Sequence, residues 1–109
     1  MNRETLPVIF RAERSGEYKG QVTAVFPTVP GTYDPASATC YTHIGQHSSC
    51  WPGWYFKTRR ATEEEAAPLL RELRGIYETG PDAVTIKPVQ RWTQRHDEAR
   101  REALRQCYV

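Results

Sequence analysis

The sequence contains no long apolar run. No stretch approaches the roughly 20 apolar residues that a membrane-spanning helix requires, and residues 1–7 lack the apolar core of a secretory signal. We therefore expect a soluble cytoplasmic protein with no membrane partner. The length of 109 residues indicates one domain, residues 1–109, and is too short for a two-domain enzyme, a dinucleotide-binding fold or a TIM barrel.

Large aliphatic residues and net charge are also scarce. Leu, Ile, Val and Phe supply only 19 of the 109 residues, a share below about 20% that is typical of disordered chains when the net charge is high. Here the net charge is only +2, and three Trp and six Tyr supply bulky apolar surface. We therefore expect a folded domain with a thin, aromatic-rich core. The same low charge does not indicate a dedicated nucleic-acid-binding domain.

Cysteine is scarce and odd in number, with only Cys40, Cys50 and Cys107, so reduced thiols are the default expectation. Cys40 and Cys50 flank His43 and His47, which gives four zinc-competent side chains within eleven residues. Structural zinc sites usually separate their ligand pairs by about a dozen residues, and Cys40 and His43 fall on opposite faces of a regular strand. We therefore expect no metal and no cofactor, with a zinc site and a Cys40–Cys50 disulfide as the alternatives.

The pattern of apolar and polar residues predicts two helices and five strands. The strands are expected at residues 6–13, 21–26, 38–44, 54–58 and 83–89, with loops at 27–35 and 45–53. Thr62 and Glu65 form the signature of a capping box that begins a helix, which ends at Gly80-Pro81. Its apolar stripe consists of Ala66, Leu69, Leu70, Leu73, Ile76 and Tyr77.

A second helix is expected from about Arg91 to near the C-terminus. Its apolar stripe is weak, and we expect it to dock weakly or to project; the stripe consists of Trp92, His96, Ala99, Ala103 and Cys107. The order β-β-β-β-α-β-α predicts an α+β fold. In this fold a mainly antiparallel sheet of four to five strands is packed by one helix and followed by the C-terminal helix.

The central segment is poor in charge and rich in aromatic residues, because Asp34 is the only charged residue between Lys19 and Lys57. Its aromatic side chains are followed by basic ones, a combination typical of protein-binding hot spots and of single-stranded nucleic-acid sites. Core packing is the alternative for the aromatic residues. The acidic run at 63–65 would repel phosphate, so we favour a protein partner, with nucleic acid possible. The predicted binding surface consists of His43, Gln46, His47, Trp51, Trp54, Arg59 and Arg60.

Two further groups of residues are candidates for a binding or catalytic site. Arginines dominate the predicted C-terminal helix, where a solvated face is expected and a partner-docking face is the alternative; they are Arg91, Arg95, Arg100, Arg101 and Arg105. His47 and Cys50 are three residues apart in a predicted loop, so an imidazole could activate a thiol nucleophile. We expect that the protein is not an enzyme. The alternative is a small enzyme or metal-dependent domain centred on His43, His47 and Cys50.

Residues 41–47 read Tyr-Thr-His-Ile-Gly-Gln-His, a Tyr-x-His-x-Gly-Gln-His segment. With this segment, a short strand at 7–10 and an Arg-x-Ala-Thr-x-Glu-Glu helix start at 59–65, the chain resembles a group of small uncharacterised bacterial and phage proteins. The resemblance implies a phage or other mobile-element origin and brings no established activity. Taking the residues and this resemblance together, we expect a small non-enzymatic binding module that recognises a host macromolecule, and small phage proteins that inhibit host defence belong to this class.

Overall fold

The computed structural model describes residues 4–43 and 46–107. The predicted Gly45 turn therefore lies outside the described residues, as do the side chains of His43 and Gln46. Along the chain the elements are β1 (Thr5–Ala12), β2 (Val22–Pro30), β3 (Ala38–His43), β4 (Gln46–Cys50), α1 (Pro52–Lys57), β5 (Arg59–Arg60), α2 (Glu63–Tyr77), β6 (Thr85–Pro88) and α3 (Gln94–Cys107).

The strands form a single mixed sheet in the order β4-β3-β2-β1-β5, and β6 also pairs with β1. Only the β1–β6 pair is parallel, and the other pairs are antiparallel. This arrangement confirms the predicted α+β fold with a mainly antiparallel sheet. Within the described residues, no helix has the length and apolar character needed to cross a membrane.

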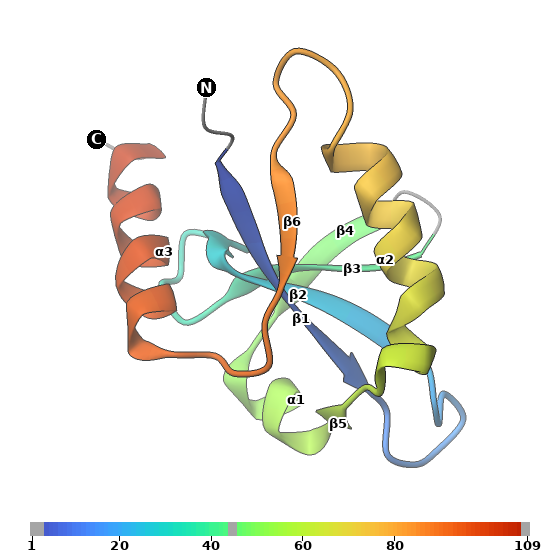
Figure 1. Ribbon diagram of the computed structural model, residues 1–109. Helices are drawn as coiled ribbons and strands as arrows, with labels where there is room; N and C mark the ends of the chain where they lie inside the picture. The colour runs from blue at the N-terminus through green and yellow to red at the C-terminus, as the bar shows by residue number, and fades with distance from the viewer. Residues whose placement is uncertain (1–3, 44–45, 108–109) are drawn as a thin grey trace.

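Helices cover both faces of the sheet, with α2 and α3 on opposite sides (Figure 1). Beneath α2 lies a core cluster built from Val8, Phe10, Ala24, Phe26, Tyr41, Ala66, Leu69, Leu73 and Ile86. On the opposite face lies a second cluster, which we call the α1 cluster: Ile9, Val25, Ala38, Cys40, Cys50 and Tyr55, with Trp54, Val89 and Trp92 packed against it. The sequence predicted one covered face, and the second arises because α1 and the segment before α3 supply aromatic residues to it.

The segment between β3 and α2 differs from its prediction. The expected loop at 45–53 contains strand β4, and the expected strand at 54–58 is the helix α1. Strand β4 has a polar sequence without apolar alternation, and it forms because it pairs along one edge with β3. Helix α1 forms because Pro52 stands at its first turn, where a missing amide donor costs nothing.

Both predicted helices are present, and both differ from their expected burial; in α3, Ala99 and Cys107 of the expected apolar stripe are exposed. In α2 the capping box is confirmed: Thr62 Oγ1 accepts from the Glu65 amide at 3.1 Å, and Glu65 Oε1 accepts from the Thr62 amide at 2.9 Å. Ile76, expected in the buried stripe, is 44% exposed. In α3 the buried residue is Arg100, with 3% exposure, so this helix docks through a cation rather than projecting.

Candidate functional site

The predicted binding residues do not form one surface. His47 lies on β4 at one end of the strand order, and Arg59 and Arg60 lie on β5 at the other. The His47 ring contacts Tyr41 at 4.9 Å between centroids, and its Nε2 lies 2.6 Å from the Tyr77 hydroxyl. These contacts place His47 on the face covered by α2.

The remaining predicted residues are engaged in structural contacts to different degrees. Trp51 precedes α1 and is 43% exposed, whereas Trp54 packs on the α1 cluster and donates from Nε1 to Glu13 at 3.1 Å. Arg59 forms a bidentate ion pair with Glu65, at 2.8 and 2.7 Å. This pair lowers the pKa of Glu65 to about 2. Arg60 donates to Gln90 Oε1 at 2.9 Å.

The structure separates the residues of the enzyme and zinc alternatives. Cys40 and Cys50 belong to the α1 cluster, while His47 contacts the aromatic residues on the opposite face of the sheet. The imidazole of His47 therefore does not stand beside the Cys50 thiol. Among the residues that the structure describes, no three His, Cys, Asp or Glu side chains converge on a possible metal position.

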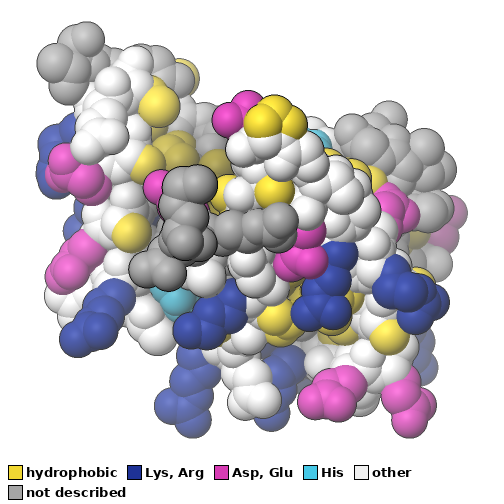
Figure 2. All heavy atoms as spheres, turned by 45° about the horizontal axis from the view of Figure 1, so that its top comes forward, with side chains coloured by type: hydrophobic (Ala, Val, Ile, Leu, Met, Phe, Trp, Pro, Cys, Tyr) yellow, Lys and Arg dark blue, Asp and Glu magenta, His cyan; other side chains and the backbone are white. Residues whose placement is uncertain are grey.

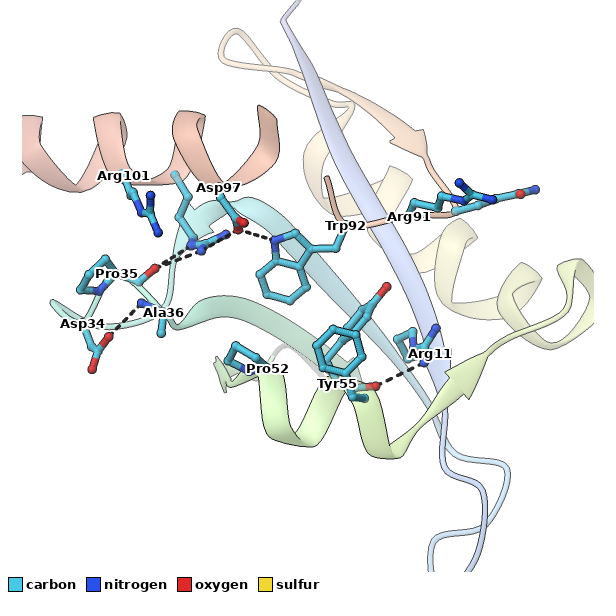
Figure 3. A pocket seen from close by; sticks show the side chains of 13 residues that line it. Arg11, Asp34, Pro35, Ala36, Pro52, Tyr55, Arg91, Trp92, Asp97 and Arg101 are labelled. Atoms are coloured by element: carbon cyan, nitrogen blue, oxygen red, sulfur yellow. Dashed lines mark hydrogen bonds and ion pairs between the residues drawn. The ribbon is translucent and has the colours of Figure 1, made fainter. Parts of the chain in front are cut away.

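A pocket of about 630 Å³ opens beside the α1 cluster (Figure 3). It is built by α1, the loop after β2, the N-terminal part of α3 with the residues before it, and Arg11 of β1. Its lining consists of Arg11, Asp34, Pro35, Ala36, Pro52, Tyr55, Phe56, Gln90, Arg91, Trp92, Asp97, Arg100 and Arg101. The segments are far apart in sequence, so the pocket exists only in the folded chain.

Aromatic rings form the apolar wall of the pocket. Tyr55 meets Trp92 edge to face at 5.1 Å between centroids, and meets Phe56 in the same way at 5.3 Å. Such edge-to-face pairs hold the rings in defined orientations. Tyr55 is buried, whereas Phe56 is 75% exposed at the rim. An apolar group entering the pocket would therefore cover Phe56 without any rearrangement of the core.

Arg100 joins the α3 side of the pocket to the loop after β2. Its guanidinium donates to the Pro27 carbonyl at 2.8 Å and to the Pro35 carbonyl at 3.0 and 3.2 Å. It also pairs with Asp97 at 2.9 Å and lies over the Trp92 ring at 5.1 Å. All three nitrogens of this buried guanidinium thus contact the protein, which makes Arg100 a structural support of the pocket.

Three other charged side chains that line the pocket already have hydrogen-bond partners in the protein. Asp97 Oδ1 also accepts from Trp92 Nε1 at 2.7 Å, and Asp34 Oδ1 accepts from the Ala36 amide at 2.8 Å. Arg11 donates to Thr58 Oγ1 at 2.9 Å and to the Thr58 carbonyl at 2.6 Å. Burial lowers the pKa of Arg11. Asp34, Asp97 and Arg11 therefore each have a hydrogen-bond partner within the protein.

Arg91 and Arg101 are the exception. Both are exposed, and neither side chain has a hydrogen bond or ion pair to any residue in the described part of the chain. In Figure 3, Arg101 extends from α3 beside Pro35, and Arg91 lies at the opposite end of the view. The pocket thus combines an aromatic wall with unpaired guanidinium groups at its rim.

Sequence reasoning found part of this site. The aromatic segment and the arginines of α3 were both candidates, yet the predicted surface omitted Tyr55, Phe56 and Trp92. A usable signal was the spacing of Trp92, His96 and Arg100, four residues apart each time, which places Arg100 on the same helical stripe as Trp92. The predicted stripe contains Ala99 instead, and Arg100 is expected on a solvated face; arginine is rarely fully buried.

Comparisons with known proteins identify no relative: no family model, no curated protein and no solved structure matches this chain. The resemblance to small bacterial and phage proteins therefore stays a prediction.

Proposed function

We propose that the protein is a non-enzymatic binding module whose pocket between α1 and α3 receives a large apolar side chain from an acidic segment of a partner protein. The observation that carries the proposal is the combination of the Tyr55–Trp92 wall with the unpaired guanidinium of Arg101. The volume of about 630 Å³ lies within the roughly 300–1,000 Å³ of ordinary ligand sites.

Charge favours an acidic segment. The lining contains four arginines and only two aspartates, and Asp97 is already paired with Arg100, so positive charge is in excess around the pocket. A carboxylate of the partner would meet Arg101 while the neighbouring apolar side chain covers Phe56. Aromatic residues and arginine are the types that dominate protein-binding hot spots.

Nucleic acid is the less favoured ligand. Stable nucleic-acid binding generally relies on several phosphate contacts, and the pocket offers only two unpaired arginines beside two carboxylates. On the face seen in Figure 2, basic and acidic side chains are interspersed rather than gathered by sign. This distribution is unlike the basic stripe of a dedicated nucleic-acid-binding domain.

The pocket also offers little for catalysis. The described residues that line it include no Ser, Cys, Lys or His, so the usual nucleophiles and the commonest general base are missing from it. Both of its carboxylates are engaged in hydrogen bonds. These features support a binding role over the alternative of a small enzyme.

Fluorescently labelled 12-residue peptides test the proposal by anisotropy. The probe carries one Trp among Asp and Glu residues, and the comparison peptides replace either the Trp by Ala or the acidic residues by Lys. We expect only the acidic Trp peptide to bind. Phe56→Ala and Arg101→Ala should each weaken its binding about fivefold or more, equivalent to about 1 kcal/mol.

Matched controls are available on the same molecule. Tyr18, an aromatic residue 62% exposed away from the pocket, controls for Phe56, and Arg95 on α3 controls for Arg101. Tyr18→Ala and Arg95→Ala should leave the affinity unchanged. Equal losses in control and pocket variants would refute the site. Tighter binding of a single-stranded oligothymidylate, weakened by Arg101→Ala, would instead establish nucleic acid as the ligand.

A further inference from the structure

Cys40 and Cys50 lie on the same face of neighbouring strands. In the β3–β4 register, Cys40 stands opposite Ser48 and Cys50 opposite Ala38, so the two cysteines are diagonal neighbours. Both are in the α1 cluster, with 5% and 3% exposure, and both are reduced. The pairing of the strands therefore holds two thiols together in a dry environment.

The two thiols differ in character. They hydrogen-bond to each other, and Ser48 Oγ lies 3.1 Å from Cys40 Sγ. The hydrogen bond from Cys50, followed by that from Ser48, lowers the pKa of Cys40, while the pKa of Cys50 is raised by the same contact and by burial. A thiolate held beside a protonated thiol is the arrangement that thiol–disulfide exchange requires.

We propose that Cys40 and Cys50 form a redox-active pair that closes a reversible disulfide between β3 and β4. The oxidant is a low-molecular-weight disulfide such as oxidised glutathione. The Cys40 thiolate attacks one of its sulfurs and expels one glutathione thiolate. Cys50 then loses its proton and attacks the Cys40 sulfur, expelling the second glutathione. Two protein thiols are oxidised to one disulfide, and one glutathione disulfide is reduced to two thiols.

The position of the pair predicts a strained disulfide whose closure requires movement of the backbone. Diagonal neighbours on antiparallel strands have Cα atoms about 7–8 Å apart, beyond the roughly 4.4–6.8 Å of relaxed disulfides. A strained bond is more easily reduced. Because β4 ends the strand order, only local opening of this edge strand is needed to admit the oxidant.

The bond would act next to the pocket. Cys50 directly precedes Trp51, the N-cap residue of α1, and Pro52 and Tyr55 of α1 line the pocket. Oxidation would therefore tie one wall of the pocket to β3. The inference does not depend on the proposed function, because the pair and its chemistry are defined without any ligand.

The test uses the full chain with Cys107→Ser, which removes the exposed third thiol. The protein is equilibrated in glutathione buffers of increasing oxidised fraction, quenched with acid, alkylated and analysed by mass spectrometry. Trypsin leaves both cysteines on one peptide, because no Lys or Arg lies between Lys19 and Lys57; chymotrypsin separates them at Tyr41. We expect one disulfide joining the two chymotryptic peptides, and its complete reversal by dithiothreitol.

Single variants in the same background assign the nucleophile. Cys50→Ser retains a hydroxyl donor for Cys40, so it should form a glutathione adduct about threefold or more faster than Cys40→Ser at pH 7. Circular dichroism checks that each variant is folded. If both Cys40 and Cys50 are alkylated at every buffer ratio, in the Cys107→Ser chain and in the wild type, the proposal is overturned. If the two single variants form the adduct at equal rates, or Cys40→Ser forms it faster, the role given to Cys40 is overturned.

Discussion

Replacing Arg100 by Ala tests whether a buried cation holds α3 on the sheet. The substitution leaves the carbonyls of Pro27 and Pro35 without their donor, and Asp97 loses its partner. Removing one member of a buried ion pair costs about 3–5 kcal/mol. Asp97 is 36% exposed and regains part of its hydration, so we expect a loss near the lower limit, about 3 kcal/mol.

The neighbouring Arg101 supplies the control, because it has the same chemistry on the same helix but is exposed. Arg101→Ala should change the free energy of unfolding by less than about 0.5 kcal/mol. Arg100→Lys keeps the charge but not the planar fork that serves two carbonyls, so its loss should lie between these values. Urea unfolding followed by circular dichroism measures all three. A loss below about 1 kcal/mol for Arg100→Ala would refute the structural role of this residue.

Two further predictions concern α2. Leu73→Ala removes a fully buried side chain and should lower the free energy of unfolding by about 2–5 kcal/mol, measured in urea. Ile76 is half exposed, so Ile76→Ala should lower it by less than about 1 kcal/mol. Equal losses for the two variants would contradict the assigned faces of the helix. Because Arg59 lowers the folded-state pKa of Glu65 to about 2 from 4.5, the stability that this pair adds is complete above about pH 4.5 and is lost as the pH falls toward 2. The melting temperature of Arg59→Gln should therefore fall less steeply over this pH range than that of the wild type, and parallel curves would count against the pair.

The sequence predicted those parts of the fold that short-range rules determine. The capping box of Thr62 and Glu65 and the stripe through Leu73 belong to one helix, so their pattern is complete without tertiary information. Helix α1 was read as a strand because it is short and its aromatic residues favour strands locally. It becomes a helix when Pro52 stands at its first turn and Tyr55 packs against Trp92, a contact between distant parts of the chain.

The site was harder to predict than the fold for the same reason. Arg100 and Arg101 are identical and adjacent in sequence, and the buried one differs in its contacts, among them those with the carbonyls of Pro27 and Pro35. A local sequence pattern does not show which backbone carbonyls of a distant segment will lie next to a helix. The sequence therefore identified the arginine-rich helix as a candidate, but it could not distinguish the arginine that supports the fold from the one available for binding.

This division determines which substitutions report on binding. Arg100 and Tyr55 shape the pocket, but each is buried and contributes to the core, so their removal would weaken binding through unfolding as well as through lost contacts. The side chains of Arg101 and Phe56 are exposed and make no hydrogen bond within the described chain, so we expect their truncation to leave the fold intact. A change in peptide affinity at these two positions, with an unchanged free energy of unfolding, is therefore attributable to contacts with the ligand.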